Sequence, residues 1–97
     1  MSTLPHSLLL IEDDPGIAQS LQNGLVREGY SVYWASDGSS GVKYARNQNP
    51  HLIILDVRLP DGSGFDFCRT MRQDGVRQPI IMLTVQNSET DKIIGLE

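Results

Sequence analysis

Short apolar runs alternate with polar loops and helix-like stretches along the chain. Four runs predict strands, because they are apolar or rich in β-branched and aromatic residues: 8–11, 30–35, 52–55 and 79–83. The runs at 8–11 and 52–55 contain no polar residue, which is typical of strands buried on both faces.

The first two intervening stretches carry helix signals. Asp14-Pro15 predicts a helix N-cap followed by proline at the first helical position. The helix that follows would end at Gly29. Asp37 predicts the cap of a second helix, with Val42 on its inner face.

Two later helices are also predicted. The third would follow the loop 57–64 and turn Phe65, Cys68 and Met71 inward. A fourth would begin at Ser88 and continue through Leu96, since an acidic residue stands three positions after the serine. Alternating strands and helices predict an α/β fold, a parallel sheet covered by helices on both faces.

Composition argues against several classes of protein. The 97 residues fit one domain and carry a net charge of −4 without a basic block. This charge argues against direct contact with nucleic acid or an anionic membrane. Apolar runs of four residues are far below the roughly 18–20 needed to cross a bilayer. The single cysteine, Cys68, excludes an internal disulfide, and the N-terminal MSTLPHS lacks a secretory signal. A cytoplasmic location is therefore expected.

Acidic residues follow the predicted strands directly. Glu12, Asp13 and Asp14 follow the first strand, Asp56 follows the third, and Thr84 follows the fourth. Parallel strands deliver their carboxyl ends to one edge, where ligands bind. Clustered carboxylates repel one another, and a hard cation with oxygen ligands relieves that repulsion. We therefore expect Asp13 and Asp56 to bind Mg²⁺, with Glu12 acting through water.

Each of these residues also has a purely structural explanation. The acids at 12–14 complement a helix N-terminus, Asp56 suits a turn, and Thr84 suits a strand. The expected convergence of all these residues at one edge of the sheet favours a ligand-binding site over the separate structural explanations. A carboxylate beside Mg²⁺ can act as a nucleophile on phosphorus. A lysine would be the natural second counter-charge, but Lys43 and Lys92 both fall within predicted helices.

Three strings of sequence carry a family resemblance. LLLIEDD, LIILDVRLPDGSG and PIIMLT resemble, in this order and spacing, the receiver domain of bacterial two-component response regulators. The resemblance implies a flavodoxin-like, doubly wound parallel sheet of order 2-1-3-4-5. It also implies roles around one pocket: phosphoacceptor Asp56, acidic pair Glu12 and Asp13, metal-binding backbone carbonyl of Arg58, loop geometry from Pro60 and Gly64, and switch hydroxyl Thr84.

The chain departs from that family at its C-terminal end. The family's lysine and aromatic switch residue belong to a fifth strand, which would lie beyond Glu97. We therefore expect residues 1–97 to be an incomplete receiver domain with the fifth strand and helix missing and no catalytic lysine. The strand at 79–83 would then have an exposed edge, which favours self-association, a homodimer included.

The resemblance implies partners as well. A sensor histidine kinase or a phosphotransfer protein would supply the phosphoryl group. The ending DKIIGLE is similar to receivers fused to winged-helix DNA-binding domains, so DNA contact and transcription regulation would belong to a C-terminal domain outside these residues. The chain itself would be a signalling domain and not an enzyme.

Two other functions remain open from the residues alone. An aspartyl-phosphate hydrolase would need a second acid two residues beyond the nucleophile, where this chain has Arg58. A receiver-like interaction module that is never phosphorylated would need no lysine, so the lack of a lysine at the predicted strand ends is compatible with this function.

Overall fold

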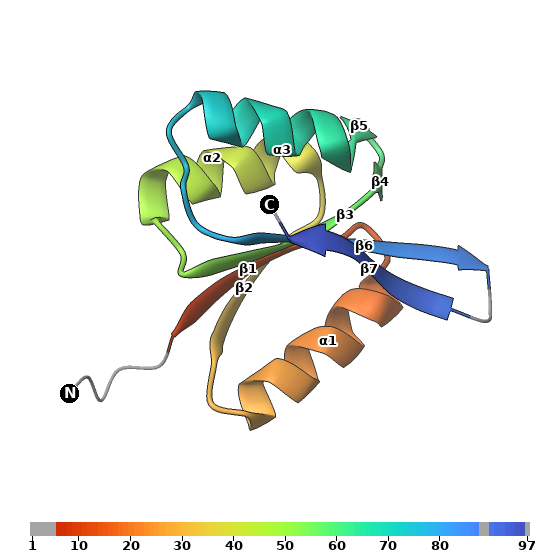
Figure 1. Cartoon of the computed structure of the whole chain (residues 1–97). Coiled ribbons are helices and arrows are strands. Elements are labelled where there is room, and N and C mark those ends of the chain that lie inside the picture. The colour runs from red at the N-terminus through yellow and green to blue at the C-terminus, as the bar shows by residue number, and fades with distance from the viewer. Residues whose placement is uncertain (1–5, 88–89, 97) are drawn as a thin grey trace.

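A sheet with helices on both faces forms the molecule (Figure 1). The computed structural model describes residues 6–87 and 90–96. Within these residues, the main sheet has the order β2-β1-β3-β6-β7 and a small sheet pairs β4 with β5. The strands are β1 (Ser7–Ile11), β2 (Ser31–Ala35), β3 (Leu52–Asp56), β4 (Arg58–Leu59), β5 (Gly62–Ser63), β6 (Ile80–Asn87) and β7 (Thr90–Leu96). The helices are α1 (Pro15–Arg27), α2 (Gly38–Gln48) and α3 (Gly64–Gln73).

The strand order 2-1-3-4 predicted for the parallel part of the sheet is confirmed. β1 lies between β2 and β3, β3 pairs with β6, and all three pairings are parallel. Figure 1 shows α2 and α3 over one face and α1 over the other. This arrangement is a doubly wound α/β fold in which β1 and β3 are central strands.

The predicted caps of the first two helices are confirmed. The Asp14 side chain accepts hydrogen bonds from the backbone N–H groups of Gly16 and Ile17, and Pro15 is the first residue of α1. The Asp37 side chain accepts a hydrogen bond from the N–H of Ser40 at the start of α2. These local signals begin both helices where the sequence predicts them.

The predicted fourth helix is wrong. Residues 90–96 form β7, which pairs antiparallel with β6 from Thr90 to Leu96; Ser88 lies outside the described residues. The segment contains the β-branched Ile93 and Ile94, which suit a strand. Pairing also satisfies backbone groups along β6 that a helix would leave exposed. The fifth position of the sheet is therefore filled by an antiparallel strand, and the expected open edge of β6 is covered.

Helix α3 packs through a different aromatic residue from the one predicted. Cys68 and Met71 are buried as expected, but Phe65 is 46% exposed. Phe67 packs against the core instead. It lies one position before Cys68 and four before Met71, so these three share a helix face that Phe65 does not.

The main core lies between the sheet and the pair α2 and α3. It collects alternate residues of the strands and the inner faces of both helices: Leu9, Ile11, Ile53, Leu55, Ile80 and Met82 with Val42, Ala45, Cys68 and Met71. Leu8 and Leu10 are also buried and point to the opposite face, which α1 covers. Burial on both faces fixes the register of β1 beside β3.

We predict that Gly64→Ala destabilises the protein. A Cβ at Gly64 would overlap the backbone carbonyl of Asp56, which cannot rotate away as a side chain can. The Gly64 N–H also donates to the Val57 carbonyl oxygen at 2.7 Å, so the two segments are held close together. We expect the free energy of unfolding to fall by about 1–3 kcal/mol, measured by urea denaturation.

Gly24→Ala is the matched control. Gly24 lies inside α1, and a Cβ there meets no atom of the described residues within 4 Å. This substitution should raise stability by about 0.5–1 kcal/mol. Equal effects of the two substitutions would contradict the steric explanation.

Candidate functional site

The pairing of β1 with β3 brings the acidic residues together. Ile11 lies opposite Leu55 in the parallel register, so Glu12 and Asp56 leave the two strands at the same level. Carboxylate oxygens of Glu12, Asp13 and Asp56 all lie within 4.8 Å of one another. The convergence of these three side chains on one edge, expected from the strand ends, is therefore present.

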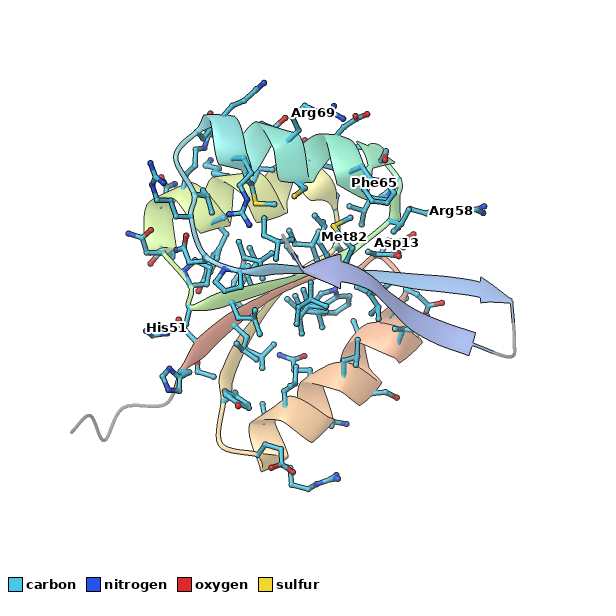
Figure 2. The ribbon with its side chains drawn as sticks, viewed as in Figure 1. Asp13, His51, Arg58, Phe65, Arg69 and Met82 are labelled. Atoms are coloured by element: carbon cyan, nitrogen blue, oxygen red, sulfur yellow. The ribbon has the colours of Figure 1, made fainter. Side chains whose placement is uncertain are left out.

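A cleft of about 320 Å³ opens at this edge. Its lining comes from the end of β1, the start of α1 and the loop after β3: Glu12, Asp13, Asp14, Ile17, Asp56, Arg58, Leu59 and Pro60. Figure 2 shows Asp13 and Arg58 at one end of the molecule and His51 at the other. The cleft is thus at the carboxyl ends of the parallel strands, where such sheets bind ligands.

Glu12 is the most deeply buried charged side chain of the described residues. It is 1% exposed. Its Oε2 accepts a hydrogen bond of 3.1 Å from the backbone N–H of Asp14, whereas its Oε1 is buried and has no hydrogen-bond partner in the part of the chain that the structure describes. The pKa of Glu12 is raised from 4.5 to about 7. Burial is the main cause, the hydrogen bond from the Asp14 N–H acts in the opposite direction, and the negative charge of Asp56 contributes to the rise.

Asp56 lies beside Glu12 at the end of β3 and is 9% exposed. The pKa of Asp56 is raised, chiefly by burial. A hydrogen bond from the backbone N–H of Arg58 lowers this pKa, and the negative charge of Asp13 raises it. The loop backbone therefore orients this carboxylate toward the cleft. The side chain of Asp13 is exposed at the mouth of the same cluster.

The loop between β3 and α3 forms one wall of the cleft. Arg58 and Leu59 pair with Gly62 and Ser63 as a short antiparallel ladder, and Pro60 lies at the bend between them. Gly64 allows the end of this loop to approach the backbone of Asp56. Pro60 therefore lies in the wall and Gly64 at its base; the role in pocket geometry that the family resemblance assigns to them stays a prediction.

The remaining candidates lie on β6, α2 and β7. Thr84 follows Leu83, which is opposite Asp56 in the β3–β6 register; the side chain of Thr84 lies outside the described residues. Lys43 is in α2 as predicted. Lys92 is not in a helix but in β7, where its backbone is opposite Thr84.

Sequence reasoning missed a contact that fixes Glu12. The Trp34 indole N–H donates to the Glu12 backbone carbonyl at 2.6 Å, and the Glu12 N–H donates to the Ala35 carbonyl at 3.0 Å. An aromatic residue in a strand signals packing only, so nothing in the sequence indicates that its N–H meets the end of β1.

Comparison with known families and curated proteins gives consistent matches. Residues 8–97 match the response regulator receiver domain. The transcriptional regulatory protein AfsQ1 of Streptomyces coelicolor is 47% identical over 94% of this chain and 40% of its own length. The alkaline phosphatase synthesis transcriptional regulatory protein PhoP of Bacillus subtilis is 43% identical over 93% of this chain and 38% of its own length. The chain thus spans about two fifths of the curated relatives it matches.

Solved structures share the fold. The chemotaxis protein CheY4 of Vibrio cholerae superposes with a TM-score of 0.79 at 31% identity, covering 88% of this chain and 72% of that one. The non-phosphorylated HemR receiver domain of Leptospira biflexa gives a TM-score of 0.76 at 35% identity, covering 86% of this chain and 67% of that one. Across the described residues, α1 to α3 are each too short or too polar to span a membrane.

The raised pKa of Glu12 predicts a stability that falls with pH when no divalent metal is present. A pKa raised by folding means that the protonated form is favoured in the folded state. This contribution is complete below pH 4.5 and is lost as the pH rises through about 7. We expect Glu12→Gln to remove it, so that the variant gains of the order of 1–3 kcal/mol over wild type between these pH values.

The measurement is urea denaturation at several pH values in the presence of a chelator, read as the difference between wild type and variant. Glu28→Gln is the control, because Glu28 is exposed at the C-cap of α1. A difference for Glu12→Gln that does not change with pH would contradict the assigned cause.

Proposed function

This chain belongs to the response regulator receiver domain family, and from that premise we propose that Asp56 accepts a phosphoryl group in a Mg²⁺-dependent reaction. The observation that carries the proposal is the convergence of Glu12, Asp13 and Asp56 beside a cleft. Family membership alone would not require these carboxylates to be present and together.

The residues of the cluster fit Mg²⁺. All the donors are oxygens, and the buried Oε1 of Glu12 has no partner among the described residues, so the cluster without a cation leaves repulsion uncompensated. In the proposed site Asp13 and Asp56 bind the ion, Glu12 acts through water, and the backbone carbonyl of Arg58 completes the protein ligands. Bound Mg²⁺ would neutralise charge on the phosphoryl oxygens.

The proposed transfer uses Asp56 as a nucleophile. One of its carboxylate oxygens attacks the phosphorus of a phosphohistidine, a P–O bond forms, and the P–N bond breaks. The released imidazole takes a proton from solvent. Because the backbone N–H groups of Arg58 and Val57 hold the carboxylate, it requires little reorientation before attack. In this proposal the hydroxyl of Thr84 binds the phosphoryl group.

The wider role is part of the proposal. A sensor histidine kinase or a phosphotransfer protein would be the donor, in the cytoplasm. The named relatives are transcriptional regulatory proteins that are longer than this chain. We therefore propose that residues 1–97 form the receiver part of a transcription regulator, in which a further C-terminal domain contacts DNA, and that the receiver acts as a signalling domain and not as a turnover enzyme.

We predict that incubation with Mg²⁺ and acetyl phosphate adds one phosphoryl group to the chain. Asp56→Asn should abolish the addition, because an amide is a poor nucleophile toward phosphorus. Intact-mass spectrometry of the protein at successive times measures the increment.

Asp66→Asn is the control, since this exposed aspartate lies on α3 and forms a local ion pair with Arg69. A wild-type chain that binds Mg²⁺ but gains no mass would support the rival interpretation, an interaction module that is never phosphorylated. Continuous release of phosphate from acetyl phosphate would instead favour a hydrolase.

A second prediction concerns the metal alone. Mg²⁺ should raise the melting temperature of wild type at pH 7.5, because a ligand of the folded state stabilises by mass action, about 2.7 kcal/mol at a hundredfold excess over Kd. Asp13→Asn should reduce this gain strongly while leaving the fold intact, because Asp13 is exposed. An undiminished Mg²⁺ effect in that variant would remove Asp13 from the site.

A further inference from the structure

An aspartate from the loop after β3 holds the first turn of α2. Asp61 accepts a hydrogen bond on Oδ1 from the backbone N–H of Gly38 at 2.8 Å. Its Oδ2 accepts from the backbone N–H and the hydroxyl of Ser39, both at 2.9 Å. One carboxylate thus spans two neighbouring N–H groups that the helix cannot satisfy itself.

The helix already has a local cap, so the contact with Asp61 is an additional one. Asp37 accepts from the N–H of Ser40, the next residue of the first turn. The two aspartates therefore divide the open donors of α2 between them, one from the helix's own sequence and one from 22 or 23 residues further along the chain. A second cap supplied from another segment fixes that segment to the helix.

The charge of Asp61 strengthens the contact. Burial acts to raise the pKa of Asp61, but the hydrogen bonds from Gly38 and Ser39 outweigh it, and the pKa lies below its ordinary value. Asp61 is therefore ionised at neutral pH, and it lies at the positive end of the α2 dipole.

The packing around this contact confirms that three elements meet there. A Cβ on Gly38 or Gly62 would meet the ring of Phe67, the first with severe overlap. The ring of Phe67, on α3, thus lies against the start of α2 and against the loop strand β5. Loop, α2 and α3 are in contact beside the cleft.

The same loop carries one wall of the acidic cleft. Arg58, Leu59 and Pro60 line the cleft, and Asp61 follows them directly. The base of the loop is tied by the bond between Gly64 and Val57, and its tip is tied to α2 by Asp61. Besides the tip contact, the wall is held by the short β4–β5 ladder and by the packing of Leu59 against the core; the bonds to Asp61 are the ones that join it to the N-terminus of α2.

We infer that Asp61 is a positioning residue for the phosphorylation pocket: by anchoring the loop tip to the N-terminus of α2, it keeps the backbone of Arg58 in the wall of the cleft that Asp13 and Asp56 also line. The inference rests on the proposed function, which supplies the metal and the phosphoryl chemistry. The Asp61 anchor would also make the first turn of α2 sensitive to metal binding in the pocket, because coupling between two sites is reciprocal.

The test compares Asp61→Ala with Asp37→Ala in the 97-residue chain. Each substitution removes a carboxylate that accepts hydrogen bonds from the first turn of α2, and each should lower the free energy of unfolding by about 0.5–2 kcal/mol. Only Asp61→Ala should weaken Mg²⁺ binding, by about tenfold in Kd measured by calorimetry, as expected when a supporting contact of a metal site is lost.

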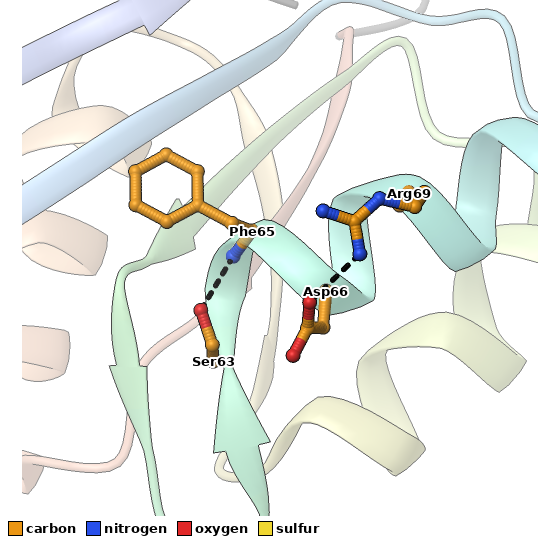
Figure 3. A network of polar contacts seen from close by, with 4 residues as sticks. All are labelled: Ser63, Phe65, Asp66 and Arg69. Atoms are coloured by element: carbon orange, nitrogen blue, oxygen red, sulfur yellow. Dashed lines mark hydrogen bonds and ion pairs between the residues drawn. The ribbon is translucent and has the colours of Figure 1, made fainter.

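Two further variants sharpen the comparison. Asp61→Asn keeps one carbonyl oxygen as an acceptor and should lose an intermediate share of the Mg²⁺ affinity. Asp66→Asn, on α3 close to the loop, breaks the ion pair with Arg69 that Figure 3 shows and should leave the affinity unchanged. Equal Mg²⁺ affinities for Asp61→Ala and Asp37→Ala would overturn the inference, because Asp61 would then be a helix cap only.

Amide hydrogen exchange tests the anchor separately from the metal. Without Mg²⁺, Asp61→Ala should speed exchange in both the loop 58–63 and the first turn of α2, whereas Asp37→Ala should affect the turn alone. If the exchange rates of the loop 58–63 were unchanged in Asp61→Ala, Asp61 would not anchor the loop. Wild type that neither binds Mg²⁺ nor takes up phosphate would refute the proposed function, and the exchange comparison would still decide whether Asp61 fixes the loop.

Discussion

The parallel pairing of β1 with β3 is the constraint on which the rest of the structure depends. It sets Ile11 beside Leu55 and so forces the carboxylates that follow them into one small space. The apolar core on both faces maintains this register, since a slip of one residue would move alternate buried side chains to the wrong face. Folding energy from the core thus opposes repulsion among the acids.

The carboxylates at the strand ends determine which ligands the cleft favours. Glu12 is buried, one of its oxygens has no hydrogen-bond partner within residues 6–87 and 90–96, and its pKa is about 7. Ionising the cluster without a cation therefore costs free energy through burial and repulsion. Such a site binds a small hard cation well because the ion removes repulsion and burial penalties together. In the proposed magnesium site, binding of the ion would recover the stability that this repulsion and burial cost.

The loop after β3 connects this chemistry to the helices. Its base is held by the hydrogen bond from the Gly64 N–H to the Val57 carbonyl, and its tip by the hydrogen bonds that Asp61 accepts from α2. A wall fixed at two points can keep backbone groups in place around a ligand without a rigid element of its own. The contact between Phe67 and the start of α2 makes the helices part of the same support.

Local sequence signals determined the parallel strands, the helix caps at Asp14 and Asp37 and the acidic residues at the strand ends, because apolar runs and capping residues act over a few positions. Tertiary structure alone decided the exposure of Phe65, the hydrogen bonds from Trp34 to Glu12 and from α2 to Asp61, and the pairing of residues 90–96 with β6. These features join segments far apart in the chain, where a residue's partner depends on how whole elements pack. For residues 90–96 the helix-capping signal was outweighed, because hydrogen bonds along the edge of β6 are available only once the sheet has formed.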